Sequence, residues 1–397
     1  MKSFTFQGPA NILFEAGAVG KIVDLVSQYG ASRILLVTDK GVRAAGLTKE
    51  AEAGMAAARM SVTVFDDVVA DPPSHVIESA AGLCRDKQIQ LVVSIGGGSA
   101  LDTAKLVAYL ARSHVPLDSI YGVGLATGPR LPLLLAPTTA GTGSEVTPIA
   151  IVTTPTTEKK GVVSPCLIPD WAILDPELTL GLPPNVTAAT GIDAMVHAIE
   201  AYTSKVKKNP MSDQLARQAL TLLAANVRLV CKDGRNLEAR SQMLLGSMLA
   251  GMAFANAPVA AVHALAYPIG AIFHVPHGLS NALVLPHVLE FNLPAAEALY
   301  AELADLVKPG LRATSQRDRA RAFIDEMISI GQDCAVPASL SAVGVGHGDL
   351  KKLAEDAMKQ TRLLVNNPRE LTFDDAYAIY SAAYDDSSNR SVRAANE

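Results

Sequence analysis

The first half of the chain alternates short apolar runs with stretches of helical periodicity. The apolar runs are rich in Val, Ile and Leu, and a polar or glycine-rich turn follows each; they span residues 33–38, 61–65, 90–95 and 131–136. Strands that are apolar throughout and alternate with helices are typical of a parallel sheet covered on both faces. The pattern therefore predicts an α/β domain. Within it, we expect one Ala-rich helix to residue 60 and a helix capped by Ser74.

Helical periodicity dominates the second half. After two consecutive prolines at 183 and 184, we expect helices over 187–203, 212–229, 237–255, 293–307, 317–331, 348–360 and 373–383. This change of pattern predicts two domains, an α/β domain over residues 1–181 and an all-helical domain over 182–397. A length of 397 residues fits this division, because a single hydrophobic core rarely serves a chain of that length.

Composition and charge exclude several classes of protein. The chain is 49% hydrophobic and 18% charged, which is typical of a well-packed globular protein. A net charge of −5 leaves no basic excess for nucleic acid. No apolar run is long enough to span a membrane, and the N-terminus lacks the apolar region of a signal peptide. We therefore expect a cytoplasmic protein, and its four scattered cysteines are expected to be reduced thiols.

Three segments at strand ends suit a dinucleotide. Gly96, Gly97, Gly98 and Ser99 lie between a strand and a helix, where backbone N–H groups can bind a pyrophosphate. Asp39 follows an earlier strand and could bind the adenosine ribose, which favours NAD over NADP. A third segment, rich in hydroxyls, contains Thr138, Thr139 and Thr142. Each segment also has a purely structural alternative. The glycines could form a turn that binds no ligand, and Asp39 could cap the next helix. The hydroxyls of the third segment could form hydrogen bonds with their own backbone.

The helical half carries candidate metal ligands. Asp193 and His197 are four residues apart, so both side chains lie on one face of a helix. Alone they could equally form a buried ion pair. Further imidazoles follow at His263, His274 and His277. Because Pro276 interrupts any helix between the last two, we expect one to be a ligand and the other either to support a ligand or to lie near the substrate. One carboxylate with three imidazoles suits Fe(II) or Zn(II). A further histidine, His287, is expected to be a core or capping residue.

These motifs together resemble the iron-containing (group III) alcohol dehydrogenases. The resemblance covers nearly the whole chain. The matching stretches are GGGSALDTAK at 96–105, PTTAGTGSEVT at 137–147, ATGIDAMVHAIEAYTS at 189–204, HALAYPIG at 263–270, FHVPHGLSNALVLPHV at 273–288 and NNPRELT at 366–372.

The resemblance implies an α/β dinucleotide-binding domain with a parallel sheet, followed by an all-α domain, which is the dehydroquinate synthase-like fold. The implied metal ligands are Asp193, His197, His263 and His277. The implied cofactor positions are Asp39, Gly96, Gly97, Gly98, Ser99, Asp102, Thr138, Thr139, Thr142 and Lys159, although Lys160 is adjacent to the last. The implied activity is NAD-dependent interconversion of an alcohol and its aldehyde or ketone. Fe(II), or alternatively Zn(II), would act as a Lewis acid on the substrate oxygen. A homo-oligomer, at least a dimer, is also implied.

One residue departs from the common family pattern. Many members carry a histidine four residues after the third ligand, where this chain has Tyr267. A tyrosine titrates much higher, so a histidine-based proton relay at this position is in doubt, and His274 could take part of that role. Phe254 and Asn256 are candidates for the substrate side, with core packing as an equal alternative.

Other functions are compatible with parts of the pattern. Maleylacetate reductases have the same two-domain plan, but they commonly lack a complete set of metal ligands. All four ligand residues are present here, which argues against this function. Glycerol or another small-polyol dehydrogenase remains open, and dehydroquinate synthase is more distant. A non-enzymatic nucleotide sensor would require the metal set to be vestigial.

Overall fold

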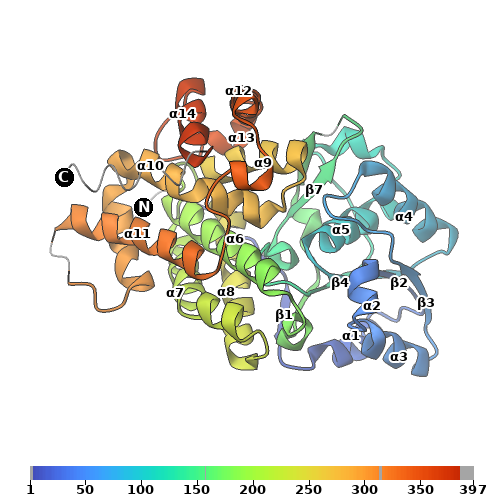
Figure 1. The fold of residues 1–397 in the computed structure, drawn as a ribbon. Coiled ribbons are helices and arrows are strands. Elements are labelled where there is room, and N and C mark those ends of the chain that lie inside the picture. Colours follow the sequence, from blue (N-terminus) through green and yellow to red (C-terminus); the bar gives the residue numbers. More distant parts are fainter. Residues whose placement is uncertain (1–2, 157, 313–314, 385–397) are drawn as a thin grey trace. The chain divides into compact units, whose positions relative to one another are not determined.

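The computed structural model describes residues 3–156, 158–312 and 315–384. Its internal contacts divide the chain into two compact units: one spans Gln7–Leu182, and the other begins at Pro183 and includes the few residues before Gln7 (Figure 1). The first unit contains the β-sheet, and the second is helical. The predicted fold class, an α/β part with a parallel sheet and an all-α part, is confirmed.

The first unit is built on a six-stranded parallel sheet. Its strand order is β1-β9-β6-β4-β2-β3, and each neighbouring pair is parallel. The strands are β1 (Asn11–Phe14), β2 (Arg33–Val37), β3 (Ser61–Phe65), β4 (Leu91–Gly96), β6 (Leu133–Pro137) and β9 (Trp171–Leu174). The four predicted strands are β2, β3, β4 and β6, and they lie next to one another in the sheet.

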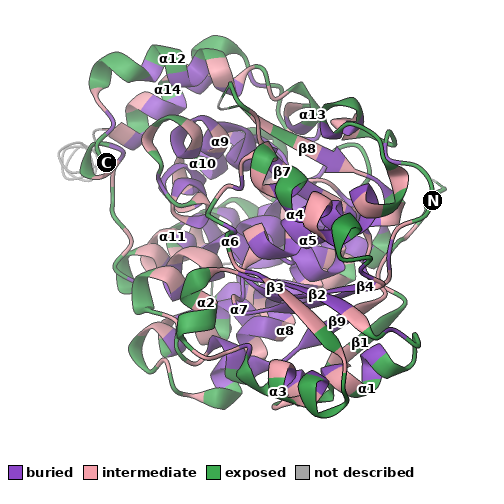
Figure 2. Cartoon of the chain, turned by 90° about the vertical axis from the view of Figure 1, so that its right-hand side faces the viewer, coloured by how far each residue is buried: buried purple, intermediate pink, exposed green. Residues whose placement is uncertain are grey.

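Two hydrophobic cores lie on opposite faces of this sheet. Leu35 and Val37 of β2 join the core that also contains apolar residues of α4 (Ser74–Asp86) and α5 (Gly98–Ser113). Ile34 and Leu36 join the other core, with residues of α1 (Ile22–Ser27) and α3 (Lys49–Ala57). Successive side chains of a strand point to opposite faces, so both faces need apolar residues. In Figure 2, the central strands β2 and β4 and most of α5 are buried, whereas the edge strand β1 is mostly exposed.

Short elements complete the first unit. A three-stranded sheet has the order β5-β8-β7, with β5 (Gly122–Val123), β7 (Ile149–Thr153) and β8 (Lys159–Val163). The remaining segments are one short α-helix and five 3₁₀ turns: α2 (Lys40–Ala44), η1 (Ala18–Lys21), η2 (Leu117–Ile120), η3 (Ser144–Val146), η4 (Pro165–Leu167) and η5 (Pro176–Thr179).

The second unit is a bundle of helices. Its elements are α6 (Pro184–Thr203), α7 (Pro210–Lys232), α8 (Leu237–Asn256), α9 (Ala261–Phe273), α10 (His277–Val307), α11 (Gln316–Asp333), η6 (Ser341–Val343), η7 (His347–Asp349), α12 (Leu350–Ala357), α13 (Thr361–Leu364) and α14 (Phe373–Tyr384). Helices α6, α7 and α8 pack against one another, and α10 packs against α6, α9 and α11 (Figure 1). Side chains from α6, α9 and α10 meet in this bundle, and they include the candidate ligands.

Three element predictions were wrong in detail. The Ala-rich helix divides into α2 and α3, because Gly46 adopts a left-handed backbone with φ 79° between them. Ser74 does not cap α4; it is the first helical residue, and Pro73 occupies the cap position without a side-chain hydrogen bond. The helix expected from residue 293 begins at His277, since Pro286 and Pro294 lie inside α10 instead of ending it.

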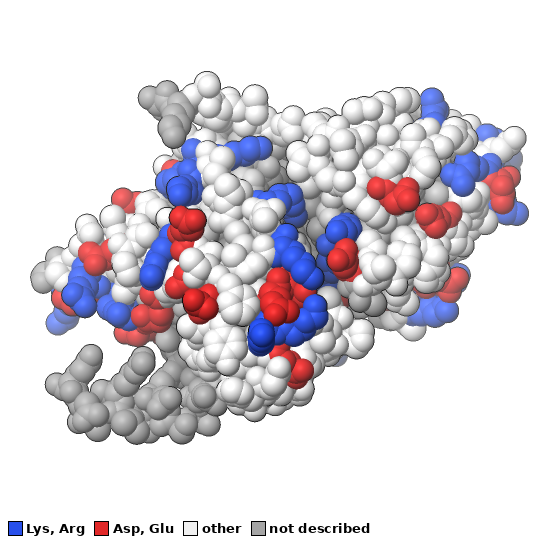
Figure 3. Space-filling view, turned by 90° about the horizontal axis from the view of Figure 1, so that it is seen from above, with Lys and Arg blue, Asp and Glu red and all other residues white. Residues whose placement is uncertain are grey.

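Within the described residues, no single helix has the length and apolar character needed to cross a membrane; α8 and α9 meet those criteria only as a pair bent by 106°. On the face in Figure 3, basic and acidic side chains are interspersed and form no continuous basic area.

Candidate metal centre and cofactor loops

Four side chains converge in the helical unit. Asp193 and His197 come from α6, His263 from the first turn of α9 and His277 from the first residue of α10. Each offers one ligand atom, and these four atoms all lie within 4.8 Å of one another. The first three are buried, and His277 keeps 30% of its side chain exposed. The i, i+4 spacing on α6 therefore places its two side chains as predicted.

The imidazole rings lie close to one another: His197 and His263 are stacked, and His277 is tilted by 51° relative to His263. The ring of His197 lies between Phe254, at a centroid distance of 4.3 Å, and His263, at 4.7 Å. His263 lies 5.4 Å from His277, and Tyr267 lies 5.8 Å from the same ring. Phe254 thus packs on a candidate ligand, and Tyr267 borders the cluster at its more exposed ligand.

The polar atoms of the cluster are rich in acceptors. The Asn281 amide nitrogen donates to Asp193 Oδ1 at 2.5 Å and lies 3.3 Å from Nε2 of both His263 and His277. One amide nitrogen thus contacts the carboxylate and two imidazoles, while Asn281 Oδ1 is buried without a hydrogen-bond partner among the described residues. Burial raises the pKa of the Asp193 carboxyl to about 6, and His263 and Asn281 oppose that rise. A divalent cation satisfies such an oxygen and nitrogen set, so these residues fit a metal.

Two residues next to the ligands were not recognised in the sequence. Glu200 on α6 contacts the His263 ring, with its Oε2 atom 2.7 Å from Nδ1. Asn281 on α10 contacts Asp193. Helical spacing carried a signal for both, because Glu200 follows His197 by three positions and Asn281 follows His277 by four.

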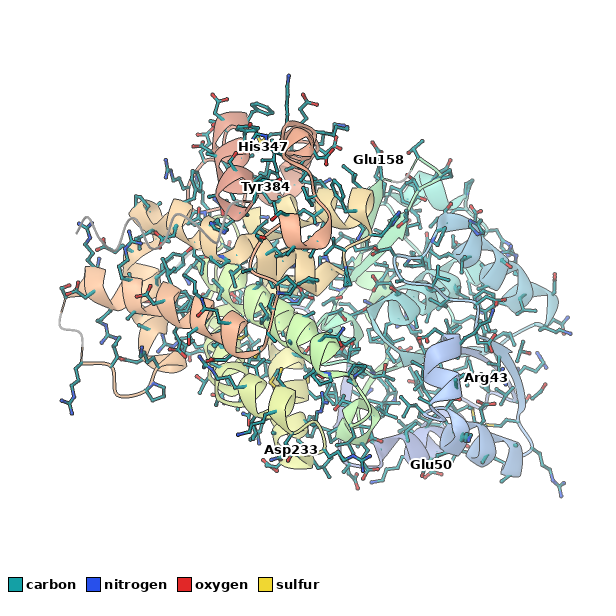
Figure 4. The ribbon with its side chains drawn as sticks, in the orientation of Figure 1. Arg43, Glu50, Glu158, Asp233, His347 and Tyr384 are labelled. Atoms are coloured by element: carbon teal, nitrogen blue, oxygen red, sulfur yellow. The ribbon has the colours of Figure 1, made fainter. Side chains whose placement is uncertain are left out.

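Other candidates of the helical unit lie outside the cluster. His274 is exposed and caps the C-terminus of α9 with φ 55°. His287 lies within α10, away from both ends of the helix. The Asn256 side chain donates to the Met252 carbonyl of its own helix at 2.9 Å. His347, for which no chemistry was predicted, meets the Tyr384 ring edge-on at 5.5 Å (Figure 4).

The three predicted cofactor segments follow neighbouring strands of the parallel sheet. Asp39 follows β2, the glycine turn follows β4 and the threonine segment follows β6; β4 pairs with both of the others. The segments touch: a Cβ at Gly98 would lie 2.7 Å from Thr142 Cγ2, and one at Gly96 would lie 3.9 Å from Asp39 Oδ2. Thr138 N–H also donates to the Gly96 carbonyl at 2.9 Å. The carboxyl edge of the sheet therefore brings all three together.

Several of these side chains also have structural roles. Asp39 Oδ1 accepts from Val42 N–H at 2.9 Å and caps α2. Ser99 Oγ lies 3.3 Å from Asp71 N, and Lys159 Nζ forms an ion pair with Asp71 at 2.7 Å. The Lys159 side chain is 5% exposed, whereas that of Lys160 is 46% exposed. Of the two lysines, Lys159 is thus the one directed toward the glycine-turn region.

A buried polar network anchors the threonine segment. Asp102 accepts from Ser144 Oγ at 2.6 Å and from Ile151 N–H at 2.9 Å, so both of its oxygens are engaged by the protein. Lys105 Nζ donates to Ser144 Oγ, Thr147 Oγ1 and the Ile149 carbonyl at 2.7–3.1 Å. Burial lowers the pKa of Lys105 to about 8. These contacts fix the loop after β6 to α5.

Two family models match the chain. A model described as "Iron-containing alcohol dehydrogenase" matches residues 9–176, and one described as "Fe-containing alcohol dehydrogenase family, C-terminal" matches residues 187–384. The chain belongs to the iron-containing alcohol dehydrogenase family. It is an oxidoreductase acting on CH–OH groups. The Asp and His cluster of this chain therefore belongs to a protein whose family is described as iron-containing.

Relatives of this alcohol dehydrogenase match along its length. It is 41% identical to "Long-chain-alcohol dehydrogenase 1" of Geobacillus thermodenitrificans over 93% of both chains. The structure is similar to that of a 1,3-propanediol oxidoreductase, with a TM-score of 0.93, 35% identity and coverage of 96% of this chain and 100% of the other. Sulfoacetaldehyde reductase of Bifidobacterium kashiwanohense in complex with NAD+ matches with a TM-score of 0.87 and 29% identity, covering 98% and 100%.

Proposed function

We propose that this alcohol dehydrogenase is an NAD-dependent enzyme that holds Fe(II) between Asp193, His197, His263 and His277. The observation that carries the proposal is the set of four ligand atoms within 4.8 Å of one another in a buried, acceptor-rich setting. Zn(II) is the alternative metal, since the same donor set suits it. The substrate is a small-molecule alcohol, or its aldehyde or ketone in the reverse direction.

The chain's own residues have distinct tasks in this proposal. A metal held at the cluster supplies Lewis acidity toward an alcohol oxygen, and NAD supplies the hydride acceptor. Three buried ligands fix the direction from which the substrate oxygen approaches, while the partly exposed His277 and adjacent Tyr267 border the accessible side. The stacked Phe254 ring limits movement of His197 and helps to exclude water.

The cofactor residues belong to the other unit. We assign the pyrophosphate to Gly96, Gly97, Gly98 and Ser99, because these residues form the start of α5 and a helix N-terminus offers backbone N–H groups to an anion. Asp39 would bind the adenosine ribose, and Thr138, Thr139 and Thr142 would line the nicotinamide side. Lys159 and Asp102 complete the proposed set, the first through its position by Asp71 and the second by anchoring Ser144.

We propose a small-molecule alcohol, or the corresponding carbonyl compound, as the substrate. The relatives are named for long-chain alcohols, 1,3-propanediol and sulfoacetaldehyde, so the family plan accommodates several sizes and charges. The complete ligand set favours an alcohol dehydrogenase over a maleylacetate reductase.

We further propose a cytoplasmic homo-oligomer, at least a dimer. Light scattering of the purified protein tests the assembly, and a monomer at micromolar concentration would contradict it.

The substitution His263→Ala tests the metal-dependent activity. It removes one ligand, so we expect less bound metal and a fall in kcat/KM of at least about 10³, equivalent to ~4 kcal/mol of transition-state stabilisation. The matched control is His347→Ala, which removes an exposed imidazole of the same unit. The assay follows nicotinamide reduction with a panel of alcohols under anaerobic conditions. Turnover by His263→Ala in chelated buffer at the wild-type rate would contradict the proposal.

A further inference from the structure

One carboxylate beside the proposed ligands has no ligand role. Glu200 lies on the same face of α6 as Asp193 and His197, at positions i+7, i and i+4. Only 3% of the residue is exposed. A buried carboxylate is costly unless hydrogen bonds or positive charge compensate it, so its partners indicate its role.

Both oxygens of Glu200 are engaged by α9. Oε1 accepts from the Val262 backbone N–H at 2.7 Å, and Oε2 lies 2.7 Å from His263 Nδ1. A carboxylate oxygen accepts hydrogen bonds, and Oε1 is already occupied by the fixed Val262 N–H donor. The 2.7 Å contact between Oε2 and His263 Nδ1 therefore selects the ring tautomer with its proton on Nδ1, which donates to Oε2.

This arrangement fixes the opposite nitrogen of the ring. With the proton on Nδ1, the lone pair of a neutral His263 lies on Nε2. That atom is 3.8 Å from Asp193 Oδ1 and 3.3 Å from the Asn281 amide nitrogen, inside the four-residue cluster. A metal ligand needs a free lone pair at the site, and a hydrogen bond from its other nitrogen determines which atom provides it.

We infer that Glu200 is a positioning residue: it holds the His263 ring in one orientation and one tautomer, so that Nε2 is the atom offered to the metal. This inference rests on the proposed metal function and extends it to a residue outside the ligand set.

A purely structural role for Glu200 is separable from this one. The Val262 N–H belongs to the first turn of α9, so Glu200 also satisfies a helix N-terminus. Loss of that contact alone would lower stability without altering the electronic environment of the metal. A spectroscopic signature of the metal therefore distinguishes the two roles.

The test compares four proteins: wild type, Glu200→Gln, Glu200→Asp and the control Glu302→Gln. The control removes a different carboxylate of the helical unit, one that accepts from the Tyr202 hydroxyl of α6. Each protein is stripped of metal. Zn(II) affinity is measured by competition with a chromophoric chelator, and the visible d–d bands are recorded after loading with Co(II). Thermal unfolding of the metal-free proteins monitors folding.

For Glu200→Gln we expect a 10- to 100-fold rise in the Kd for Zn(II) and altered Co(II) bands. A glutamine side chain places an oxygen at only one of the two positions, so its NH2 group would face either the Val262 N–H or the His263 N–H, donor against donor. Glu200→Asp keeps the charge but is shorter by one methylene, so a smaller rise of roughly threefold to tenfold is expected. Glu302→Gln should match wild type.

Wild-type Kd and wild-type Co(II) bands in Glu200→Gln would overturn the inference while leaving the metal function intact. If Glu200→Gln does not fold, the same result in Glu200→Asp overturns it. Failure of the wild type to bind Zn(II) or Co(II) at all would overturn the proposed function and this inference with it.

Discussion

At the residue scale, Glu145 is a buried carboxylate in the loop after β6. Burial raises its pKa from 4.5 to about 7, and its own backbone N–H and Lys105 oppose the rise. Its Oε1 has no hydrogen-bond partner within the part of the chain that the structure describes. Because the folded-state pKa lies above the unfolded value, its contribution to stability is complete below pH 4.5. That contribution is lost as the pH rises through 7, at a maximum of about 3 kcal/mol.

The substitution Glu145→Gln should therefore help stability more at higher pH. A glutamine resembles the protonated carboxyl, so we expect its free energy of unfolding relative to wild type to rise by about 1–3 kcal/mol between roughly pH 5 and pH 8. Chemical unfolding at the two pH values measures this. Glu158→Gln is the control, because Glu158 is exposed (Figure 4). An equal difference between variant and wild type at both pH values would contradict the prediction.

Asp39 permits a test of cofactor choice without loss of a helix cap. Asparagine caps a helix as well as aspartate does, so Asp39→Asn preserves the contact with Val42 N–H and removes only the charge. We expect the NADP to NAD ratio of kcat/KM to rise about tenfold, or ~1.4 kcal/mol. Asp24→Asn, at an exposed carboxylate of the same unit, is the control. An unchanged ratio would argue against ribose recognition by Asp39.

The metal ligands were easier to predict from the sequence than the residues that contact them. Asp193 and His197 are recognisable because helical spacing puts them on one face, and the family motifs select His263 and His277. Glu200 was missed because its partner, His263, is distant in sequence, and only the packing of α9 on α6 brings them together. Residue types alone do not reveal such a contact.

At the scale of elements, the approach of α10 to α6 requires Gly278. A Cβ there would lie 2.3 Å from the Ala189 carbonyl oxygen and 3.2 Å from Asp193 Cβ. Backbone atoms of a helix cannot yield, so Gly278→Ala should push α10 away and separate His277 from Asp193. We expect the Kd for Zn(II) to rise more than about tenfold, equivalent to ~1.4 kcal/mol.

The control for this helix contact is Gly331→Ala in α11. A Cβ at Gly331 meets nothing within 4 Å, so alanine should leave metal affinity unchanged and stabilise the helix by up to about 1 kcal/mol. Chelator competition measures affinity for both variants. Equal Kd values for Gly278→Ala and wild type would show that the α6–α10 contact does not control the ligand geometry.

Element boundaries were predictable where local signals agreed. Strands β2, β3, β4 and β6 were recognised because apolar runs and turn residues coincide there. Helix α10 was not predicted in full, because prolines such as Pro286 and Pro294 usually indicate the end of a helix. Packing against α6, α9 and α11 compensates for the backbone hydrogen bonds that the two prolines omit.

At the scale of the whole molecule, the proposed metal ligands and the proposed cofactor residues belong to different compact units. Removal of the metal should therefore abolish turnover but change the Kd for NADH by less than about threefold, or ~0.7 kcal/mol. Nucleotide fluorescence of the chelated protein measures this. Loss of NADH binding together with the metal would contradict independent sites.

The most direct test of the account is a metal titration of the stripped protein. Fe(II), and separately Zn(II), is added back anaerobically while alcohol-dependent reduction of NAD is followed. The account predicts no turnover without metal and a linear recovery that ends at one bound ion per chain in the wild type, with none in His263→Ala. Full turnover in the stripped wild type, or equal recovery in His263→Ala, would contradict it.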